Sequence, residues 1–234
     1  MSLDEQENNY WINFWTNNPI LENEDPQCQV GRTIGKIPID QQQWQLTLKE
    51  VEKTLDLRPD DTLLDLCAGN GLLSIPLSLK CRSVTAVDIS KTMLERIDTA
   101  LYPNINIMIG DARKIQLPTE AFSKGLIYFA LQFFSERETI GIFEKIFQSL
   151  VQGGTFLVGD ILDIDRLFVY HNKPVWKKAY FDSVKNNAPA VGTWFKAEVL
   201  AEMAKYVGFS YAEIIGQRPD LINSHYRFDL LLKK

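Results

Sequence analysis

An acid placed just before a glycine turn is the first candidate for chemistry in this chain. Residues 63–74 read LLDLCAGNGLLS, in which Asp65 interrupts an apolar run and Gly69 and Gly71 follow it. Glycine turns between a strand and a helix often bind phosphate, because backbone N–H groups and the helix dipole point at the ligand. Asp65 would repel such an anion. The turn therefore favours a ligand that is cationic and carries no phosphate.

S-adenosylmethionine (SAM) is a ligand of that kind, since it carries a sulfonium and an ammonium group. The competing interpretation is a dinucleotide site, which requires the pattern G-x-G-x-x-G/A. Here Ser74 stands at the third small position, and Asp65 would again face the anionic ligand. Taken alone, the two glycines are also compatible with a simple turn.

Strands and helices alternate on both sides of this turn. Apolar runs predict strands at 62–67, 83–88, 105–110, 125–130, 155–160, 209–216 and 226–232. Amphipathic or capped segments predict helices at about 40–56 and 71–79, from 90, from 135 and at 199–207. Continuously apolar strands that alternate with such helices indicate a mostly parallel sheet with helices on both faces. We therefore predict a doubly wound α/β domain whose ligand binds at the carboxyl ends of the strands.

Four segments at successive strand ends resemble the class I SAM-dependent methyltransferases. LLDLCAGNG is similar to the first motif of that family, VTAVDIS to its ribose-binding segment, IGDAR to its adenine-binding step and QGGTFLVGD to its turn into the fifth strand. The resemblance covers most of residues 58–232. It implies SAM as the cofactor and a seven-stranded sheet of order 3-2-1-4-5-7-6 with the last strand antiparallel. Cys67 stands where the family usually has glycine, an exchange that the turn tolerates if φ at Cys67 is negative.

The resemblance also implies a role for each matching residue. Asp65 would face the methionine ammonium, and Asp88, about 20 residues further on, would accept hydrogen bonds from both ribose hydroxyls. Asp111 would accept a hydrogen bond from the adenine amino group. The other cofactor-binding residues that it implies are Ala68, Gly69, Gly71, Ile89, Ala112 and Phe129. Without the family, Asp88 and Asp111 are equally compatible with a helix cap and an Asx turn.

The substrate side of the site is expected in an insertion at about 161–195. This segment is far longer than ordinary α/β loops of about 2–6 residues, and its many aromatic residues suit a small-molecule pocket or packing onto the sheet. His171 is a candidate general base, because its pKa range suits proton transfer near neutral pH; the alternative is an exposed loop histidine. Asp160 is a candidate to orient a substrate hydroxyl, the alternative being a turn or cap. Too few acids converge for a metal site, so none is expected.

The first 39 residues are expected to form a mostly irregular extension. Within it, Tyr10, Trp11, Phe14 and Trp15 share one face of a short helix that either covers the cofactor or packs on the sheet. Arg32 is a candidate clamp for a carboxylate, or else a solvated surface charge. The domains are therefore predicted as an N-terminal lid at 1–39 and a methyltransferase domain at 40–234.

Composition narrows the class of partner. The 234 residues include 25 basic and 30 acidic side chains, a net charge of −5, with no basic stripe, which argues against nucleic acid as the partner. No window reaches the ~20 apolar residues of a membrane span, and no signal peptide pattern begins the chain. Three cysteines without metal spacing fit reduced thiols. We predict a cytoplasmic monomer or homodimer that methylates an O, N or C nucleophile of a small molecule; the alternatives are an NAD-dependent oxidoreductase and a SAM-binding protein without turnover.

Overall fold

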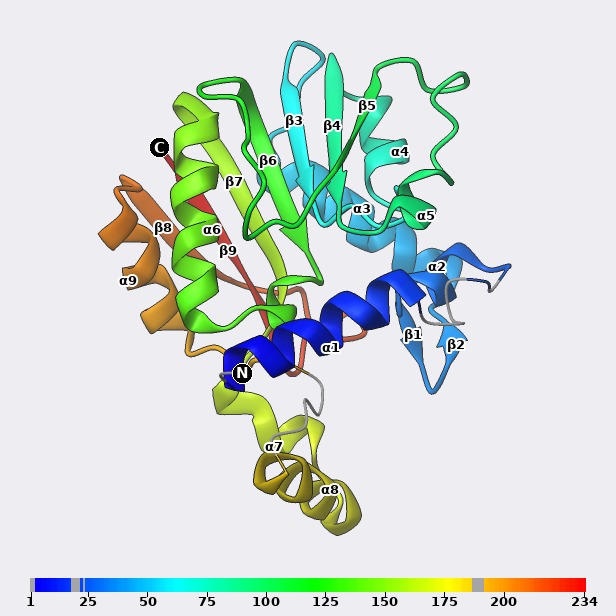
Figure 1. The fold of residues 1–234 in the computed structure, drawn as a ribbon, viewed down its shortest axis with the longest axis vertical. Coiled ribbons are helices and arrows are strands. Elements are labelled where there is room, and N and C mark those ends of the chain that lie inside the picture. Colours follow the sequence, from blue (N-terminus) through cyan, green and yellow to red (C-terminus); the bar gives the residue numbers. More distant parts are fainter. Residues whose placement is uncertain (1–2, 18–21, 23, 187–191) are drawn as a thin grey trace.

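The computed structural model describes residues 3–17, 22, 24–186 and 192–234, and its centre is a seven-stranded sheet of order β5-β4-β3-β6-β7-β9-β8 (Figure 1). The strands are β3 (Thr62–Leu66), β4 (Ser83–Asp88), β5 (Ile105–Ile109), β6 (Phe122–Tyr128), β7 (Leu150–Leu162), β8 (Tyr211–Gly216) and β9 (Arg227–Lys233). Neighbouring strands are parallel, except that β9 runs antiparallel to both β7 and β8. In chain order this is the 3-2-1-4-5-7-6 arrangement, so the predicted fold class is confirmed.

The two faces of the sheet are buried under different helices, because successive strand side chains point in opposite directions. On β3, Leu63 packs in the cluster with α3 (Gln41–Leu55) and α4 (Ser74–Ser78), whereas Leu64 packs in the cluster with α6 (Glu136–Ser149) and α9 (Ala197–Val207). The short α5 (Lys91–Leu94) follows β4. Both residues on β3 are fully buried, which explains the continuously apolar strand sequence.

Local capping fixes where the long helices begin. Ser135 Oγ accepts from the Glu138 backbone N–H, and the Glu138 carboxylate accepts from the Ser135 N–H at 2.9 Å, so the predicted capping box of α6 is present. Asp40 caps α3 in the same sense by accepting from the Gln43 N–H at 2.9 Å.

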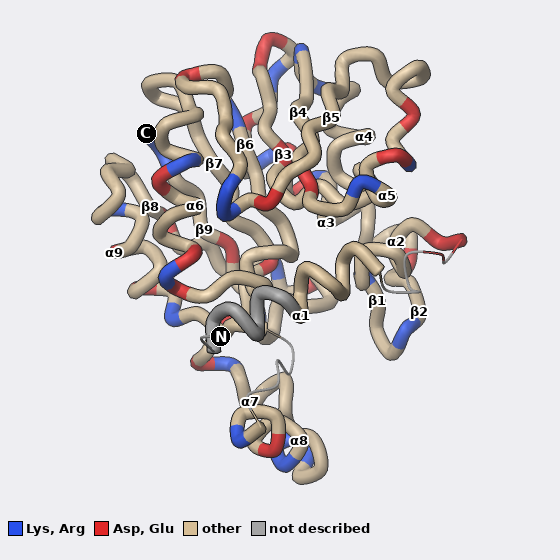
Figure 2. Tube along the Cα trace, viewed as in Figure 1, with Lys and Arg blue, Asp and Glu red and all other residues tan. Residues whose placement is uncertain are grey.

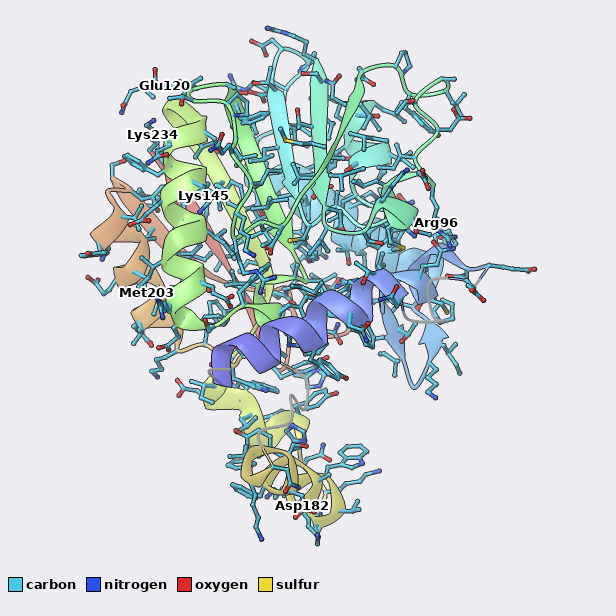
Figure 3. The ribbon with its side chains drawn as sticks, in the orientation of Figure 1. Arg96, Glu120, Lys145, Asp182, Met203 and Lys234 are labelled. Atoms are coloured by element: carbon cyan, nitrogen blue, oxygen red, sulfur yellow. The ribbon has the colours of Figure 1, made fainter. Side chains whose placement is uncertain are left out.

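At the amino-terminal edge of the sheet, Lys234 pairs with Glu120 at 3.7 Å (Figure 3).

The N-terminal segment is more regular than its turn-rich sequence predicts. It contains α1 (Leu3–Asn17), α2 (Pro26–Gln29) and a hairpin of β1 (Thr33–Ile34) and β2 (Ile37–Pro38). The expectation of a mostly irregular extension is wrong here, because tertiary packing supplies the stability that the local sequence lacks. The rings of Trp11 and Trp15 contact the ring of Phe133, with centroids 4.6 and 5.3 Å apart. Helix α1 thereby crosses the edge at which the parallel strands end (Figure 1).

The segment after β7 leaves the sheet and returns to it. It forms η3 (Ile164–Arg166), α7 (Leu167–Tyr170) and α8 (Pro174–Lys185), and Figure 3 marks Asp182 on α8, well away from the sheet. The chain comes back at Phe195, which is buried and bridges Asp163. Parts of the predicted lid and insertion, namely residues 1–2, 18–21, 23 and 187–191, lie outside the described residues.

Two features are absent from the described part of the chain. None of its helices is long and apolar enough to cross a membrane. The same residues contain no group of three or more His, Cys, Asp or Glu side chains arranged to hold a metal ion.

Candidate functional site

A cavity opens at the edge of the sheet where β3, β4 and β6 end (the carboxyl edge), and α1 covers it. We call it the first cavity. Eight of the nine predicted cofactor-binding residues line it: Asp65, Ala68, Gly69, Asp88, Ile89, Asp111, Ala112 and Phe129. They come from four segments that lie far apart in the sequence, and parallel strands bring them to one edge. The ninth, Gly71, lies outside the lining.

The backbone at this edge adopts left-handed conformations at non-glycine residues. Cys67 after β3 has φ 64°, Phe129 after β6 has φ 59°, and Asp160 in β7 has φ 59°. The condition of a negative φ at Cys67 is therefore wrong: the turn keeps the conformation that suits glycine, and cysteine is held there. Such conformations cost about 1–3 kcal/mol each and are concentrated at functional sites.

The two glycines of the turn meet different needs. Gly69 has φ 57°, and its N–H donates to Asp88 Oδ2 at 2.8 Å, which joins the turn after β3 to the end of β4. Gly71 has φ 78°, and a Cβ there would lie 2.7 Å from Ile97 Cγ1. Gly71 is thus required for the packing of the turn against Ile97.

Two buried carboxylates in the first cavity have no cationic partner. Asp65 accepts a hydrogen bond from Ser74 Oγ at 2.6 Å, and Asp88 accepts from the N–H groups of Gly69 and Ser90, both at 2.8 Å. Within the described residues, neither carboxylate pairs with a lysine or arginine. Burial raises the pKa of Asp65 to about 7 against the lowering effect of Ser74, and burial likewise raises the pKa of Asp88. A cationic ligand would reverse the shift at Asp65.

The third acid of the cavity already has a partner. Arg113 Nε donates to Asp111 Oδ1 at 2.8 Å and Arg113 Nη2 to Asp111 Oδ2 at 2.8 Å, a bidentate pair. Burial alone would raise the pKa of Asp111, but these hydrogen bonds and the charge of Arg113 lower it. Glu138 holds the other side of Arg113 at 3.2 Å. The sequence prediction omitted Arg113, although its position two residues after Asp111 was a usable signal.

Three buried N–H donors on residues that line the first cavity have no acceptor among the described residues. They are the indole N–H groups of Trp11 and Trp15 and the Nε–H of Arg32, all buried. Buried donors are nearly always hydrogen-bonded, and an unpaired one costs about 1–3 kcal/mol. The cavity therefore combines uncompensated carboxylates with unsatisfied donors, a pattern that a zwitterionic ligand can satisfy. The sequence prediction assigned the two tryptophans to a lid face and missed their N–H groups.

Asp160 belongs to a buried hydrogen-bond network beside the first cavity, although it does not line that cavity. Its Oδ2 accepts from Arg32 Nη1 at 2.5 Å, and its Oδ1 accepts from Gln217 Nε2 at 3.1 Å. Burial would raise the pKa of Asp160, but the charges of Arg32 and Arg227 lower it. Arg32, in turn, is buried by this pair and is no solvated surface charge. Asp160 thus fixes Arg32 against the sheet, and its role toward a substrate stays a prediction.

His171 lies away from the first cavity. It follows α7 and lines a second cavity, together with His225, between the β1–β2 hairpin, α7–α8 and the segment before β9. The structure therefore places His171 apart from the predicted cofactor-binding residues, whereas Asp160 lies beside them through its bond to Arg32. The role of His171 as a general base remains untested.

Known proteins that resemble this chain over part of its length include several methyltransferases. A family described as a methyltransferase domain matches residues 63–154. The chain is 32% identical over 91 residues to a demethylmenaquinone methyltransferase of Streptomyces avermitilis, which covers 39% of each protein. It is 33% identical over 60 residues to a probable ribosomal RNA small subunit methyltransferase A of Pyrobaculum aerophilum, which covers 26% of each. The chain thus spans about a quarter to a half of the length of such curated relatives.

Solved structures match over a longer part of the chain but at low identity. A phosphoethanolamine N-methyltransferase 1 of Haemonchus contortus, solved with phosphoethanolamine and S-adenosylhomocysteine, aligns with a TM-score of 0.72 and 15% identity, covering all of this chain and 50% of that one. A SAM-dependent methyltransferase of Leishmania major aligns with a TM-score of 0.68 and 11% identity, covering 97% and 83%. At these identities the match establishes the fold.

Proposed function

We propose a function on the premise that this chain belongs to the class I SAM-dependent methyltransferases, by its family match and its fold. The protein transfers the sulfonium methyl group of SAM to an O, N or C nucleophile of a small molecule. The observation that carries the proposal is the pair of buried carboxylates, Asp65 and Asp88, which line one cavity without a cationic partner among the described residues. SAM supplies an activated methyl group, so the protein needs chiefly to position the acceptor.

The residues of the first cavity fit SAM in their chemistry. The Asp65 carboxylate can accept a hydrogen bond from the ammonium, and Asp88 keeps free lone pairs for two hydroxyls beside its bonds to Gly69 and Ser90. The unsatisfied N–H donors of Trp11, Trp15 and Arg32 suit a carboxylate. A dinucleotide would instead place a pyrophosphate near Asp65, which is electrostatically unfavourable.

A small molecule is favoured over nucleic acid as the acceptor. Along the trace, lysines and arginines are interspersed with acids, and acidic residues outnumber basic ones, 30 to 25 (Figure 2). Polynucleotide binding depends on a basic face. Residues of α1 line the cavity, an arrangement that suits a ligand that can be enclosed.

Titration calorimetry tests the cofactor directly. We expect SAM and S-adenosylhomocysteine to bind with a dissociation constant of about 1 µM or tighter, and NAD to bind at least about 100-fold more weakly. Tight NAD binding without any heat from SAM would overturn the proposal. If SAM binds and no acceptor is ever methylated, the protein would be a SAM-binding protein without turnover.

Helix α1 acts as a lid in this proposal. The first cavity has a volume of about 130 Å³, well below the about 300–1,000 Å³ typical of ligand pockets. The ligand therefore has to displace Trp11 and Trp15 outward before it settles against the sheet. Afterwards the two indoles exclude water from the site and donate their N–H groups to the ligand.

If α1 is a lid, substitutions in it should change the affinity for SAM more than the melting temperature of the ligand-free protein. Trp15→Ala should weaken SAM binding about tenfold, because it removes an enclosing ring and an N–H donor, while the melting temperature of the ligand-free protein changes little. Tyr10→Ala on the same helix is the matched control, since Tyr10 is 47% exposed and lies outside the cavity. A Trp15→Ala protein that melts much earlier yet binds SAM normally would show that Trp15 is simply part of the core.

A further inference from the structure

The second cavity is a feature of the described part of the chain that the proposed function leaves unused. Its volume is about 680 Å³, within the about 300–1,000 Å³ of sites that enclose small molecules. Its lining residues come from the β1–β2 hairpin, α7–α8 and the segment that leads into β9; Figure 1 labels these elements.

The walls of this cavity are aromatic and uncharged. Tyr170, Trp176, Tyr180 and Tyr226 supply four rings, and within the described part of the chain no lysine, arginine, aspartate or glutamate lines it. Aromatic rings in such a wall favour a flat apolar ligand. Lys173 and Arg227 lie over the rings of Trp176 and Tyr226, 4.5 and 5.2 Å from the ring centroids, and neither of them lines the cavity. The lining itself supplies rings and no charged side chain, which favours an uncharged aromatic molecule.

One polar side chain of this lining lacks a partner. His171 is only 7% exposed, and its Nε2 is buried without a hydrogen-bond partner among the described residues. Its ring is held between those of Tyr170 and Tyr180, at centroid distances of 4.8 and 5.1 Å. Burial lowers the pKa of His171, so the ring is neutral at pH 7 and attracts no anion.

A hydroxyl is the group that fits Nε2 best. In a neutral imidazole this nitrogen is either a donor or an acceptor, according to the tautomer. A hydroxyl can both donate and accept, so it satisfies either tautomer, whereas a carbonyl or an ether satisfies only one. We propose that the second cavity is a binding site for an uncharged aromatic compound that carries a hydroxyl group, with His171 Nε2 as its polar anchor.

Residues that are adjacent in the sequence connect the two cavities. Thr33 lines the second cavity and its neighbour Arg32 lines the first; Tyr226 lines the second, and its neighbour Arg227 lies 4.7 Å from the ring of Phe129, which lines the first. The ligand of the second cavity is thus either the methyl acceptor or a compound that modulates the first cavity. The binding site itself does not depend on methyl transfer and is tested without SAM.

Calorimetry with 2-naphthol as the probe tests the site in the full chain. We expect 2-naphthol to bind, naphthalene to bind about tenfold more weakly because it cannot bond to His171, and naphthalene-2-sulfonate not to bind. In His171→Phe the ring is kept and the nitrogen is lost, so the preference for 2-naphthol over naphthalene should disappear. Equal binding of all three compounds to the wild-type protein would overturn the proposal.

A substitution that fills the second cavity tests whether 2-naphthol binds there, and a control on the same helix tests whether the variant is folded. Ala179→Trp on α8 places a large side chain in the lining, whereas Val184→Trp on the same helix lies outside it and is the matched control. We expect Ala179→Trp to abolish 2-naphthol binding and Val184→Trp to leave it unchanged, with equal melting temperatures. Unchanged binding to Ala179→Trp would place the ligand elsewhere and overturn the proposal.

A last experiment distinguishes the two possible roles of the ligand, methyl acceptor and modulator. Methyl-labelled SAM is added to the 2-naphthol complex, and the label is followed. Label on the naphthol oxygen identifies an acceptor, and altered SAM affinity without label identifies a modulator; either result supports the site. If SAM does not bind at all, the proposed function fails, while the 2-naphthol measurements still decide the second cavity.

Discussion

Asp65→Asn should make the protein more stable and a weaker binder of SAM. Asp65 is buried at the end of β3, only 2% exposed, and its pKa is raised to about 7 because burial disfavours the charge. Asparagine keeps the shape and an oxygen for the Ser74 hydroxyl but carries no charge. If Asp65 serves to bind the ligand and not to stabilise the fold, its substitution raises the free energy of unfolding and lowers the affinity for the ligand.

The pH dependence follows from the direction of the shift. In the unfolded chain the Asp65 carboxyl ionises near pH 3.8, and in the folded protein near pH 7. The folded state therefore binds the extra proton, and stability is lost as the pH rises from about 4 to about 7. The difference corresponds to about 4 kcal/mol. We expect Asp65→Asn to recover about 1–3 kcal/mol at pH 8, since a buried amide also carries a desolvation cost, and nothing below pH 4.

Urea denaturation at pH 4 and pH 8 measures this gain, and calorimetry measures the affinity. SAM and S-adenosylhomocysteine both carry the ammonium, so both should bind about tenfold or more weakly, whereas a deaminated analogue should lose little. Asp60→Asn, at an exposed position, is the control and should change neither quantity. Loss of stability at pH 8, with equal losses for all three ligands, would show that Asp65 is a structural acceptor for the glycine turn.

The sheet and its carboxyl edge follow from local patterns in the sequence. Each central strand is a short apolar run between turn residues, and a parallel sheet with helices on both faces is the arrangement that buries all of them. Once that sheet is assumed, the strand-end acids Asp65, Asp88 and Asp111 must meet at one edge. Those residues were predictable because strand ends are local features, and the order of the parallel strands brings them together.

Pairs between distant segments were not predictable in the same way. Arg32 donates a hydrogen bond to Asp160, which lies 128 residues further along the chain. Ser74 donates a hydrogen bond to Asp65 because the glycine turn between them folds back on the strand. The helical spacing of Trp11 and Trp15 predicts their shared face but says nothing of the N–H groups left unpaired. The left-handed φ of Cys67 was also hidden, because the sequence has cysteine where the conformation favours glycine.

Asp88→Ala should lower both stability and affinity, in contrast to Asp65→Asn. The Asp88 carboxylate caps the N–H groups of Gly69 and Ser90, and each uncapped N–H that finds no other partner costs about 1–3 kcal/mol. Removal of a buried charge offsets part of this cost, so a net destabilisation of about 1–2 kcal/mol is expected. Two bonds to ribose hydroxyls, each worth about 1.5–3 kcal/mol, would also be lost, which weakens SAM binding by at least about 100-fold.

A coupled measurement separates the ribose contact from a disturbed turn. S-adenosylhomocysteine and its 2′,3′-dideoxy analogue are titrated against the wild-type protein, Asp88→Asn and Asp88→Ala. If Asp88 accepts from the ribose hydroxyls, the analogue binds the wild type much more weakly but binds Asp88→Ala about as well as the parent compound, because the two changes remove the same bonds. Asp88→Asn, which keeps one acceptor oxygen, should fall between them. Additive losses would mean that Asp88 supports the turn through Gly69 and Ser90 and that the ribose is held by other residues.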